Sequence, residues 1–281
     1  MNPLRSLLFV PATSERKIDK AFSSEADGVI IDLEDAVAIG EKAAARAVLA
    51  GLAAGPRRVP CWVRINAMST TFCHLDVLAC VRPNIAGIVL PKVETPDDIR
   101  AVDWLMSQVE NESGLPARSI GLIAIIETAR GLVKVDEIAA ASPRLGRLMF
   151  GAVDLAADMS ISIDDAGGAT AQARFAITRA SRAAGLEAPL DTAFTDIPNL
   201  DGLRATTQRA KALGYAGKSC IHPSQAAVVN EVFSASPDEL AWAREVVEQF
   251  AKAEANGLAA FKLHGEMIDY PVVERARKLL G

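Results

Sequence analysis

The sequence predicts an α/β protein of the (β/α)8 TIM-barrel class with a C-terminal helical lid or arm. Short apolar segments rich in β-branched residues alternate with stretches of helical period, which is typical of consecutive βα units around a parallel sheet. Eight such units occur, and 281 residues, half of them apolar, are enough for one barrel. No GxGxxG segment follows the first apolar run, so the alternative, a doubly wound open sheet, has less support.

Eight segments are predicted to be the strands of this barrel, and a helical stretch follows each of them. The predicted strands cover residues 6–11, 28–35, 61–66, 87–92, 120–127, 146–154, 187–194 and 217–223. Each is a short apolar run, as expected for strands that are buried on both faces of a parallel sheet. The count of eight favours closure into a barrel.

The chain is predicted to divide near residue 233. No low-complexity tract or long linker interrupts residues 1–233, which we assign to the barrel. Residues 234–240 are typical of a turn and a helix N-cap, and a helix is expected over roughly 238–255. Two glycines, a proline and a short amphipathic helix follow. We assign residues 234–281 to a C-terminal helix and a lid segment, which could also serve as a subunit-contact arm.

Composition and charge exclude several classes of protein. The formal net charge of −5 leaves no broad basic surface for a nucleic-acid backbone, although local basic residues could bind small anions. The first apolar run is too short to span a membrane, and no later segment reaches about 18 unbroken apolar residues. The four cysteines form no CxxC pair and are expected to be reduced, buried thiols; they are Cys61, Cys73, Cys80 and Cys220. We therefore expect a cytoplasmic protein with no nucleic-acid or membrane partner.

Polar side chains stand at the C-terminal ends of the predicted strands, where the βα loops of a barrel converge on one pocket. In chain order they are Asp32, Glu34, Asp35, Arg64, Asn66, Lys92, Glu127, Asp154, Asp191, Lys218 and His222. Any one of these charges could simply cap the next helix or pair with a neighbour. Together they predict a pocket that holds a metal ion and an anionic substrate.

Glu127 and Asp154 are the predicted metal ligands. Each ends an otherwise apolar run, so both carboxylates would reach the barrel mouth from adjacent strands. Glu is not a preferred helix N-cap, which weakens the alternative role for Glu127. Two carboxylates without nearby His or Cys ligands suit a hard cation that keeps water ligands, which is the behaviour of Mg2+. The three histidines are scattered in the sequence, so zinc is not expected.

A basic cluster, Arg16, Lys17 and Lys20, lies on the helix that Thr13 or Ser14 opens after the first strand. Free N–H groups at a helix N-terminus beside cations bind phosphates well. An ordinary solvated helix face is the simpler interpretation, and the pattern alone favours it.

These residues resemble the family of citrate lyase beta subunits, malyl-CoA and citramalyl-CoA lyases, and their metal-dependent aldolase relatives. The resemblance keeps its order through nearly the whole chain, and the matching segments are LFVPA (8–12), DGVIIDLEDAV (27–37), WVRIN (62–66), GIVLPK (87–92), IIET (125–128), FGAVD (150–154), GYAGKSCIHPSQ (214–225) and GEMIDYP (265–271). It implies a TIM barrel, often trimeric, whose metal is held by Glu127 and Asp154. It also implies that Arg64 binds the carboxylate or carbonyl of a keto acid.

The same resemblance implies that residues near the first helix bind CoA, and we assign Arg16, Lys20 and Lys92 to cofactor binding. One departure from the family pattern lies here. Malyl-CoA lyases often carry an Arg soon after the LFVP motif, where residues 12–14 of this sequence are Ala-Thr-Ser. Lys20 keeps its basic position, and Arg16 could substitute for the missing Arg.

The expected reaction cleaves or forms a β-hydroxyacyl-CoA such as citramalyl-, malyl- or citryl-CoA, with acetyl-CoA and a small α-keto acid as the other reactants. Its site must polarise a hydroxyl that becomes a carbonyl and must stabilise an enolate. Arg64 would add a planar, bidentate cation for the keto-acid carboxylate. A general acid or base is also required, and Glu34, Asp35 and Asp269 are candidates.

Asp269 lies in the C-terminal tail. Its segment resembles the family's lid, in which a matching Asp reaches the active site of a neighbouring subunit, so a homotrimer or hexamer is expected. The alternative is that Asp269 only caps the final helix.

Three other functions stay open at the level of sequence. The chain could be a citrate lyase beta subunit that acts on a citryl group carried by an acyl carrier protein. It could be a pyruvate aldolase on free hydroxy-keto acids, or a non-catalytic barrel subunit, although retention of the two carboxylates and Arg64 argues against the last. Glyoxylate, pyruvate and oxaloacetate differ by one small substituent, so the sequence does not identify the acid that is released.

Overall fold

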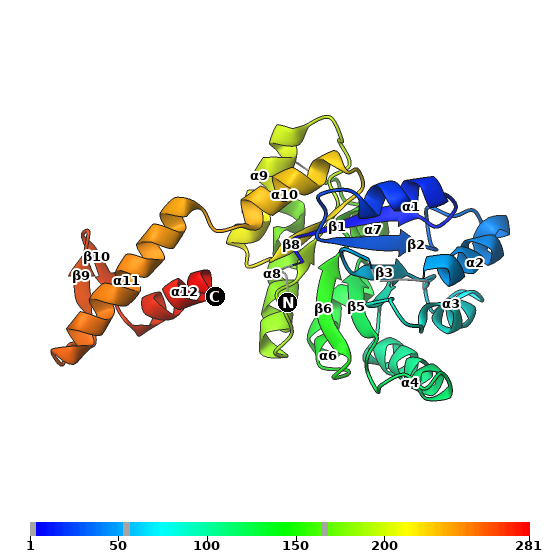
Figure 1. Cartoon of the computed structure of the whole chain (residues 1–281), viewed down its shortest axis with the longest axis horizontal. Coiled ribbons are helices and arrows are strands. Elements are labelled where there is room, and N and C mark those ends of the chain that lie inside the picture. Colours follow the sequence, from blue (N-terminus) through cyan, green and yellow to red (C-terminus); the bar gives the residue numbers. More distant parts are fainter. Residues whose placement is uncertain (1–3, 53–56, 164–167) are drawn as a thin grey trace. The chain divides into compact units, whose positions relative to one another are not determined.

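The computed structural model describes residues 4–52, 57–163 and 168–281. Within them, eight parallel strands pair in chain order, and the eighth pairs with the first to close a barrel (Figure 1). The strands are β1 (Ser6–Pro11), β2 (Gly28–Asp32), β3 (Cys61–Arg64), β4 (Gly87–Leu90), β5 (Gly121–Ile126), β6 (Leu145–Phe150), β7 (Leu190–Asp191) and β8 (Gly217–Cys220). This closed parallel barrel confirms the predicted fold class.

Helices alternate with the strands and surround the barrel (Figure 1). They are α1 (Glu15–Phe22), α2 (Lys42–Leu52), α3 (Cys73–Cys80), α4 (Pro96–Glu112), α5 (Ala129–Val133), α6 (Val135–Ala139), α7 (Ala152–Met159), α8 (Gly168–Ala183), α9 (Leu200–Ala212) and α10 (Ser224–Phe233), with a 3-10 turn, η1 (Ile39–Glu41), before α2. No helix within the described ranges is long and apolar enough to cross a membrane.

Several strands end earlier than predicted, and the difference matters most for the sixth. β2 stops at Asp32, and β7 is only two residues long. β6 stops at Phe150, and residues 152–154, predicted as strand, form the first turn of α7. That part of the prediction is wrong because the N–H of Ala152 donates to the hydroxyl of Thr192 instead of continuing the strand ladder.

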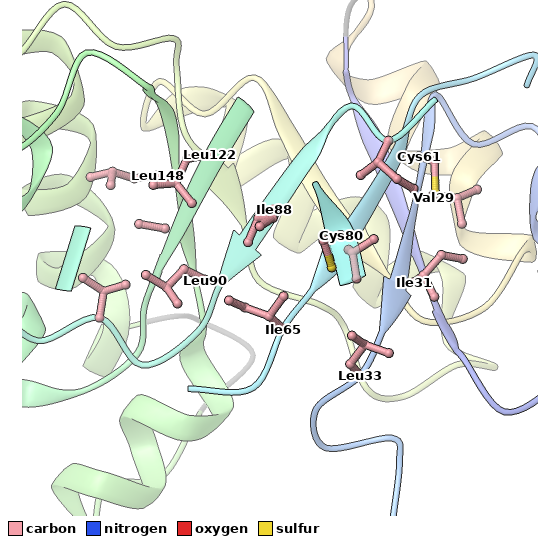
Figure 2. Close-up of a cluster of buried hydrophobic side chains, with 14 of the residues drawn as sticks. Val29, Ile31, Leu33, Cys61, Ile65, Cys80, Ile88, Leu90, Leu122 and Leu148 are labelled. Atoms are coloured by element: carbon pink, nitrogen blue, oxygen red, sulfur yellow. The ribbon is translucent and has the colours of Figure 1, made fainter. Parts of the chain in front are cut away.

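The period of two along each strand divides its side chains between two apolar layers. In β2, Val29 and Ile31 pack between the strands and the surrounding helices, in the cluster that Figure 2 shows. Ile30, between them in sequence, packs inside the barrel with residues from other strands, such as Leu7 and Met149. Full burial of each such side chain is worth about 1.5–3 kcal/mol. The barrel interior is therefore a packed core, which leaves only its ends for chemistry.

Glycines in β4 and β5 make room for the largest side chain inside the barrel. A Cβ built at Gly87 would lie 2.2 Å from the ring of Trp62, and one at Gly121 would lie 3.2 Å from it. The Gly87 Cβ would also lie 2.6 Å from the carbonyl oxygen of Gly121, so neither the ring nor the backbone leaves space for a side chain. These glycines serve the close approach of an indole ring and a neighbouring strand.

A buried arginine joins α4 to the start of β6. The side chain of Arg144 is 1% exposed and lies 2.5 Å from Asp103 and 2.7 Å from Glu110, both on α4. It also donates to the carbonyl oxygen of Ile120, just before β5, at 2.8 Å. These contacts form a clamp around Arg144 at the N-terminal ends of the strands. In a TIM barrel this end contributes to stability, whereas catalytic residues lie at the opposite end.

Residues 234–281 form a second compact unit with its own small core. α11 (Pro237–Ala255) begins with a capping box between Ser236 and Glu239, and α12 (Tyr270–Leu280) ends the chain. Between them lies a hairpin that was not predicted, β9 (Phe261–Leu263) and β10 (Glu266–Ile268). His264 and Gly265 both have positive φ, of 48° and 92°, as a two-residue type I′ turn requires. Gly265 is thus a turn residue of this hairpin.

The clamp around Arg144 predicts a large loss of stability when its charge is removed. Arg144→Met leaves the two α4 carboxylates without their buried cation, and we expect the free energy of unfolding to fall by about 3–5 kcal/mol. Arg100→Met, which removes an exposed ion pair from the same helix, should cost less than about 1 kcal/mol. Urea unfolding of both variants checks this, and equal midpoints would contradict it.

Candidate active site

The C-terminal ends of the strands surround a central cavity of about 460 Å³. Its walls come from seven strand ends or the loops and helix starts after them, and the polar residues among them are Asp32, Asp35, Arg64, Glu127, Asp154, Thr192 and Ser219. Of the nine residues that were assigned a catalytic, metal-binding or cofactor-binding role from the sequence, four line this cavity: Asp35, Arg64, Glu127 and Asp154. The other predicted residues lie elsewhere, and each has its own surroundings.

Asp32 organises the acidic loop after β2. Its carboxylate is buried and accepts hydrogen bonds from the N–H groups of Glu34 at 2.9 Å and Ala36 at 3.1 Å. The same carboxylate pairs with the guanidinium of Arg64, at the end of β3. One side chain thus fixes the loop and joins two strand ends. In the sequence, Asp32 was a candidate site residue because it follows an apolar run. Nothing in the sequence distinguished its role from that of Glu34 or Asp35.

Arg64 is held in place on several sides. Its Nε and Nη2 donate to the two oxygens of Asp32 at 2.7 and 2.6 Å. Its Nη1 lies 3.1 Å from Glu34 and 3.6 Å from Asp35, and its guanidinium carbon lies 4.9 Å from the centre of the Phe9 ring. Burial alone would lower the pKa of Arg64, but the hydrogen bonds and charge of Asp32 raise it overall. The bidentate edge predicted for a substrate is therefore occupied by Asp32, and Nη1 is the part that faces the acidic loop.

Glu34 is buried behind Arg64. Its Oε1 lies 3.0 Å from Nζ of Lys92. Its Oε2 is close to Arg64 but lacks the geometry of a hydrogen bond. Burial raises the pKa of Glu34, and the charge of Asp35 adds to this, while Arg64 and Lys92 oppose it. Glu34 does not line the central cavity, so its surroundings fit support of Arg64 better than contact with a substrate.

Lys92 connects the acidic loop to the predicted metal ligand. It adopts a left-handed backbone conformation with φ of 51°, which is uncommon for a residue with a side chain and often marks a functional site. In this conformation its N–H donates to Oε1 of Glu127 at 2.8 Å, while its ammonium pairs with Glu34 and lies 3.7 Å from Asp35. Lys92 lines a neighbouring cavity and not the central one.

Glu127 is a buried carboxylate. It takes part in none of the ion pairs found among the residues that the structure describes. It is 2% exposed and follows the last residue of β5. Burial raises the pKa of Glu127 to about 8, and the negative charges of Asp154 and Glu34 contribute to the rise. Gly151 makes room for it, because a Cβ there would lie 2.3 Å from Glu127 Oε2. The Glu127 carboxylate is therefore costly to ionise in this buried position. A bound cation would stabilise its charged form.

Asp154 reaches the same cavity from a helix and not from a strand end, which corrects the predicted placement. It lies in the first turn of α7 and is half-buried. Within the described residues there is no group of three or more His, Cys, Asp or Glu side chains arranged for a metal. The protein would therefore supply two carboxylates, and this donor set fits a hard divalent cation that takes its other ligands from water and substrate.

The basic first helix faces a cavity that adjoins the central one. This cavity, of about 310 Å³, is lined by Lys17, Lys20 and His222 and shares Phe9, Val10, Pro11 and Ile221 with the central cavity. Ser14, and not Thr13, caps α1 and accepts the N–H of Lys17 at 3.4 Å. Arg16 is exposed and lines none of these cavities. Arg16 and Lys20 are the first-helix residues that were assigned to cofactor binding, and of these two Lys20 lines this cavity. Lys17, which belongs to the same basic cluster, lines it too.

Asp269 belongs to the second unit. Its side chain caps α12 by accepting the N–H of Val272 at 3.4 Å, which is the alternative role considered from the sequence. The local contacts of Asp269 are thus those of a helix cap, and a role in chemistry stays a prediction.

Lys42 was missed by sequence reasoning. It opens α2, and its buried ammonium donates to the carbonyl oxygens of Leu33 and Glu34, at 2.7 Å each. Burial lowers the pKa of Lys42, while nearby carboxylates, Asp32 first, oppose the shift. Lys42 therefore holds the acidic loop in place through two of its backbone carbonyl groups. In the sequence it is one of two cations on an Ala-rich helix, a pattern that normally indicates a solvated face.

Comparison with known proteins places the chain among lyases. A model of the family HpcH/HpaI aldolase/citrate lyase matches residues 5–223. The citrate lyase subunit beta of Haemophilus influenzae is 32% identical, over 98% of this chain and 95% of that one. The L-malyl-CoA/beta-methylmalyl-CoA lyase of Cereibacter sphaeroides is 34% identical, over 99% and 94%.

Solved structures agree with this result. CitE from Mycobacterium tuberculosis, in complex with magnesium, acetoacetate and coenzyme A, is 34% identical and covers 99% of this chain and 97% of its own, with a TM-score of 0.82. A citrate lyase from Burkholderia xenovorans superposes with a TM-score of 0.87 at 20% identity, which supports the fold alone.

We predict that Glu127→Gln and Asp154→Asn each weaken Mg2+ binding by at least about 100-fold, because each removes one of two charged protein ligands. The thermal midpoint of the metal-free protein should not fall, since both substitutions keep the size of the side chain. Isothermal titration with Mg2+ checks the prediction, and Glu137→Gln, on the exposed face of α6, is the control. Wild-type affinity in either variant would remove that residue from the metal site.

The raised pKa of Glu127 predicts a pH dependence of metal binding. Below about pH 8 the metal-free protein carries a proton on Glu127, and Mg2+ must displace it. The affinity should therefore fall as the pH is lowered from 8 to 6, by up to about tenfold per unit. Titrations at pH 7 in buffers of different ionisation enthalpy should reveal proton release in the wild type and none from this position in Glu127→Gln. Binding without proton release at pH 7 would contradict the prediction.

Proposed function

Because the chain belongs to the HpcH/HpaI aldolase/citrate lyase family, we propose that it is a Mg2+-dependent carbon–carbon lyase acting on a β-hydroxyacyl-CoA thioester. Cleavage would release acetyl-CoA and a small α-keto acid, and the reverse reaction would join them. The observation that carries this proposal is that Glu127 and Asp154 line one cavity with Arg64. The citrate lyase and malyl-CoA lyase relatives support both the reaction class and the family resemblance read from the sequence.

Glu127 and Asp154 would hold Mg2+. When bound, the ion would act as a Lewis acid towards the substrate oxygen that changes between hydroxyl and carbonyl. The buried Glu127 carboxylate and the space that Gly151 leaves beside it support this assignment. The magnesium bound to the related CitE supports the choice of ion.

Arg64 would bind the carboxylate of the keto acid through Nη1. Asp32 uses the Nε and Nη2 edge, and this pair would hold the guanidinium in one orientation throughout the reaction. In the substrate-free protein Nη1 faces Glu34 and Asp35, so a substrate carboxylate would replace part of that contact. Lys92 would then retain Glu34 through its ammonium.

The reaction needs proton transfer at two places. As the carbon–carbon bond breaks, its electron pair passes to the thioester as an enolate, the hydroxyl loses its proton, and the enolate carbon later takes one. Asp35 lines the cavity and is half exposed, which supports it over the buried Glu34 as the group that exchanges the hydroxyl proton. Asp269, contributed by a neighbouring subunit of a homotrimer or hexamer, would exchange the proton at the enolate carbon. A cytoplasmic location belongs to the same proposal.

The cavity beside α1 would hold the phosphates of CoA. Lys17 and Lys20 line it, and its shared wall with the central cavity would let the thioester reach the metal. Arg16 is exposed on the same helix, and Lys92 is paired with Glu34, so their assignment to cofactor binding has weaker support.

A second candidate is the beta subunit of a citrate lyase, acting on a citryl group carried by an acyl carrier protein. The similarity to the Haemophilus influenzae subunit over nearly the full length of both chains favours it. A pyruvate aldolase acting on free hydroxy-keto acids would leave the cavity beside α1 without a ligand, and we rank it lower.

A substrate panel tests the proposal. The protein should cleave at least one of malyl-, citramalyl- and citryl-CoA with Mg2+, and activity should be lost on chelation. Turnover of citryl-acyl carrier protein alone would favour the citrate lyase subunit. Turnover of free hydroxy-keto acids alone would favour the aldolase. Lack of turnover of every substrate by a protein that binds Mg2+ would contradict a lyase function.

Asp269→Asn separates catalysis from helix capping, because Asn caps a helix about as well as Asp but does not exchange a proton at neutral pH. We expect kcat to fall by roughly two or more orders of magnitude, with Mg2+ affinity and thermal stability nearly unchanged. Mixed oligomers of Asp269→Asn and Arg64→Ala subunits should recover some activity. Wild-type turnover by Asp269→Asn would leave capping as its role, and verified mixed oligomers without recovery would exclude action between subunits.

A further inference from the structure

Asn66 is a polar residue at a strand end that the proposed reaction does not use. It follows β3 by two positions, is 3% exposed, and lines none of the cavities described above. Its side-chain nitrogen, Nδ2, donates to the carboxylate of Asp76 at 2.6 Å and to the carbonyl oxygen of Leu33 at 3.0 Å. The amide of Asn66 therefore joins two different segments of the chain.

The two partners fix the orientation of the Asn66 amide. An ionised carboxylate and a carbonyl group only accept hydrogen bonds, so the nitrogen of the amide, and not its oxygen, faces both of them. The backbone N–H of Asn66 donates to the same Asp76 oxygen at 2.9 Å. Residue 66 is thus bound to Asp76 through its main chain and its side chain, which keeps the second hydrogen of the amide on Leu33.

Asp76 anchors Asn66 to the helices around the barrel. Asp76 is fully buried in the first turn of α3, and its other oxygen, Oδ1, accepts from Arg46 on α2 at 3.0 Å. A buried carboxylate is costly unless it is paired and hydrogen-bonded, and these donors meet that condition. A satisfied buried network of this kind is rigid, so Asn66 has a fixed point of attachment.

Leu33 is the residue through which Asn66 contacts the acidic loop. It directly follows β2, and its carbonyl oxygen also accepts from the ammonium of Lys42 at 2.7 Å. The N–H groups of Glu34 and Ala36, farther along the loop, bind the carboxylate of Asp32. The start of the loop is therefore held at a carbonyl group by two side-chain donors, and the rest of the loop is held by Asp32.

The position of this loop determines the surroundings of Arg64. Nη1, the group that would bind a keto-acid carboxylate, lies 3.1 Å from Glu34 and 3.6 Å from Asp35. The other edge of the guanidinium binds Asp32, whose carboxylate also binds the loop. A displacement of the loop would therefore move every carboxylate that faces Arg64. A shift of about 1 Å at such a site is enough to reduce activity strongly.

We propose that Asn66 is a positioning residue for the keto-acid carboxylate. It acts through the carbonyl group of Leu33 on the acidic loop, and through the loop on Arg64. The inference rests on the proposed lyase function for the identity of the substrate, whereas the contact with the loop does not depend on it. Lys42 remains as a second donor to Leu33, so loss of the Asn66 amide should loosen the loop without unfolding the barrel.

Two variants separate positioning of the loop from simple stability. Asn66→Ala removes both contacts of the amide and keeps the backbone N–H on Asp76. The double variant Asn66→Asp with Asp76→Asn exchanges the two groups, so the amide at position 76 can donate to the carboxylate at position 66. That carboxylate has no hydrogen for Leu33. Asn111→Ala, at an exposed position of α4, is the matched control. Either variant is sufficient for the tests if the other does not fold.

Hydrogen exchange in the protein without metal or substrate tests the loop contact independently of any activity. Mass spectrometry of a peptide over residues 33–37 follows the N–H groups that bind Asp32. We expect them to exchange about tenfold faster or more in both variants, because a buried hydrogen bond to the loop is lost. A peptide over α4 should exchange as in the wild type, and Asn111→Ala should change neither.

Wild-type exchange of the loop in a folded variant overturns the proposal. Equal acceleration in the loop and in α4 overturns it too, because that result is general destabilisation. Recovery of wild-type exchange in the double variant would show that the pair between positions 66 and 76 is sufficient. The contact with Leu33 would then have no role.

Steady-state kinetics of the condensation give the readout that is specific to the substrate. Acetyl-CoA is assayed with whichever of pyruvate, glyoxylate and oxaloacetate the wild type accepts. KM for the keto acid should rise about tenfold or more in both variants. KM for acetyl-CoA should stay near its wild-type value, because no residue of the acidic loop lines the cavity beside α1 among those described.

A role in stability alone would lower the active fraction, and with it kcat, and leave both KM values unchanged. An unchanged KM for the keto acid, or equal rises for both substrates, therefore overturns the proposal. Unchanged loop exchange in an active lyase would contradict this inference and not the proposed function. Faster loop exchange in a protein that turns over none of the substrates would contradict the proposed function while supporting the contact of Asn66 with the loop.

Discussion

The pair between Arg64 and Asp32 is the contact on which the rest of the site depends. It joins the ends of β2 and β3 by two short hydrogen bonds in a buried position, and loss of one partner of such a pair typically costs about 3–5 kcal/mol. The same Asp32 carboxylate fixes the acidic loop through two N–H groups. From Arg64 the contacts continue to Glu34, from there to Lys92, and through the Lys92 N–H to Glu127. One continuous set of contacts thus positions side chains from four strand ends.

Charge at the mouth of the barrel is unbalanced, and this imbalance has a chemical use. Five carboxylates gather there, but two cationic side chains, Arg64 and Lys92, pair with them directly among the described residues. Burial is the main cause of the raised pKa values of Glu127 and Glu34, and neighbouring negative charge adds to it, because both disfavour ionisation. A divalent cation would relieve this cost.

Local pattern was sufficient to predict the scaffold. Each strand begins within about a residue of its predicted start, except the short β7, because an apolar run between polar stretches is a local property of the chain. The predicted ends were less accurate. Val153 and its neighbours are apolar and look like strand, but a hydrogen bond from Ala152 to Thr192, forty residues away, starts a helix instead. Arg64 and Glu127 could be placed at strand ends for the same local reason, and they do line the cavity.

The sequence by itself therefore determined the barrel, the positions of most charged residues at its mouth, and the family to which those motifs belong. Only the tertiary structure decided which of these charges meet. The Nε and Nη2 edge of the Arg64 guanidinium binds Asp32 and not a ligand. Lys42 is buried under the acidic loop, and Asp191 pairs with Lys218. The physical reason is that each such contact joins different segments of the chain, between 8 and 32 positions apart, and its partner depends on strand order, register and burial. No local pattern contains that information, because equal charges at strand ends look alike until the barrel closes.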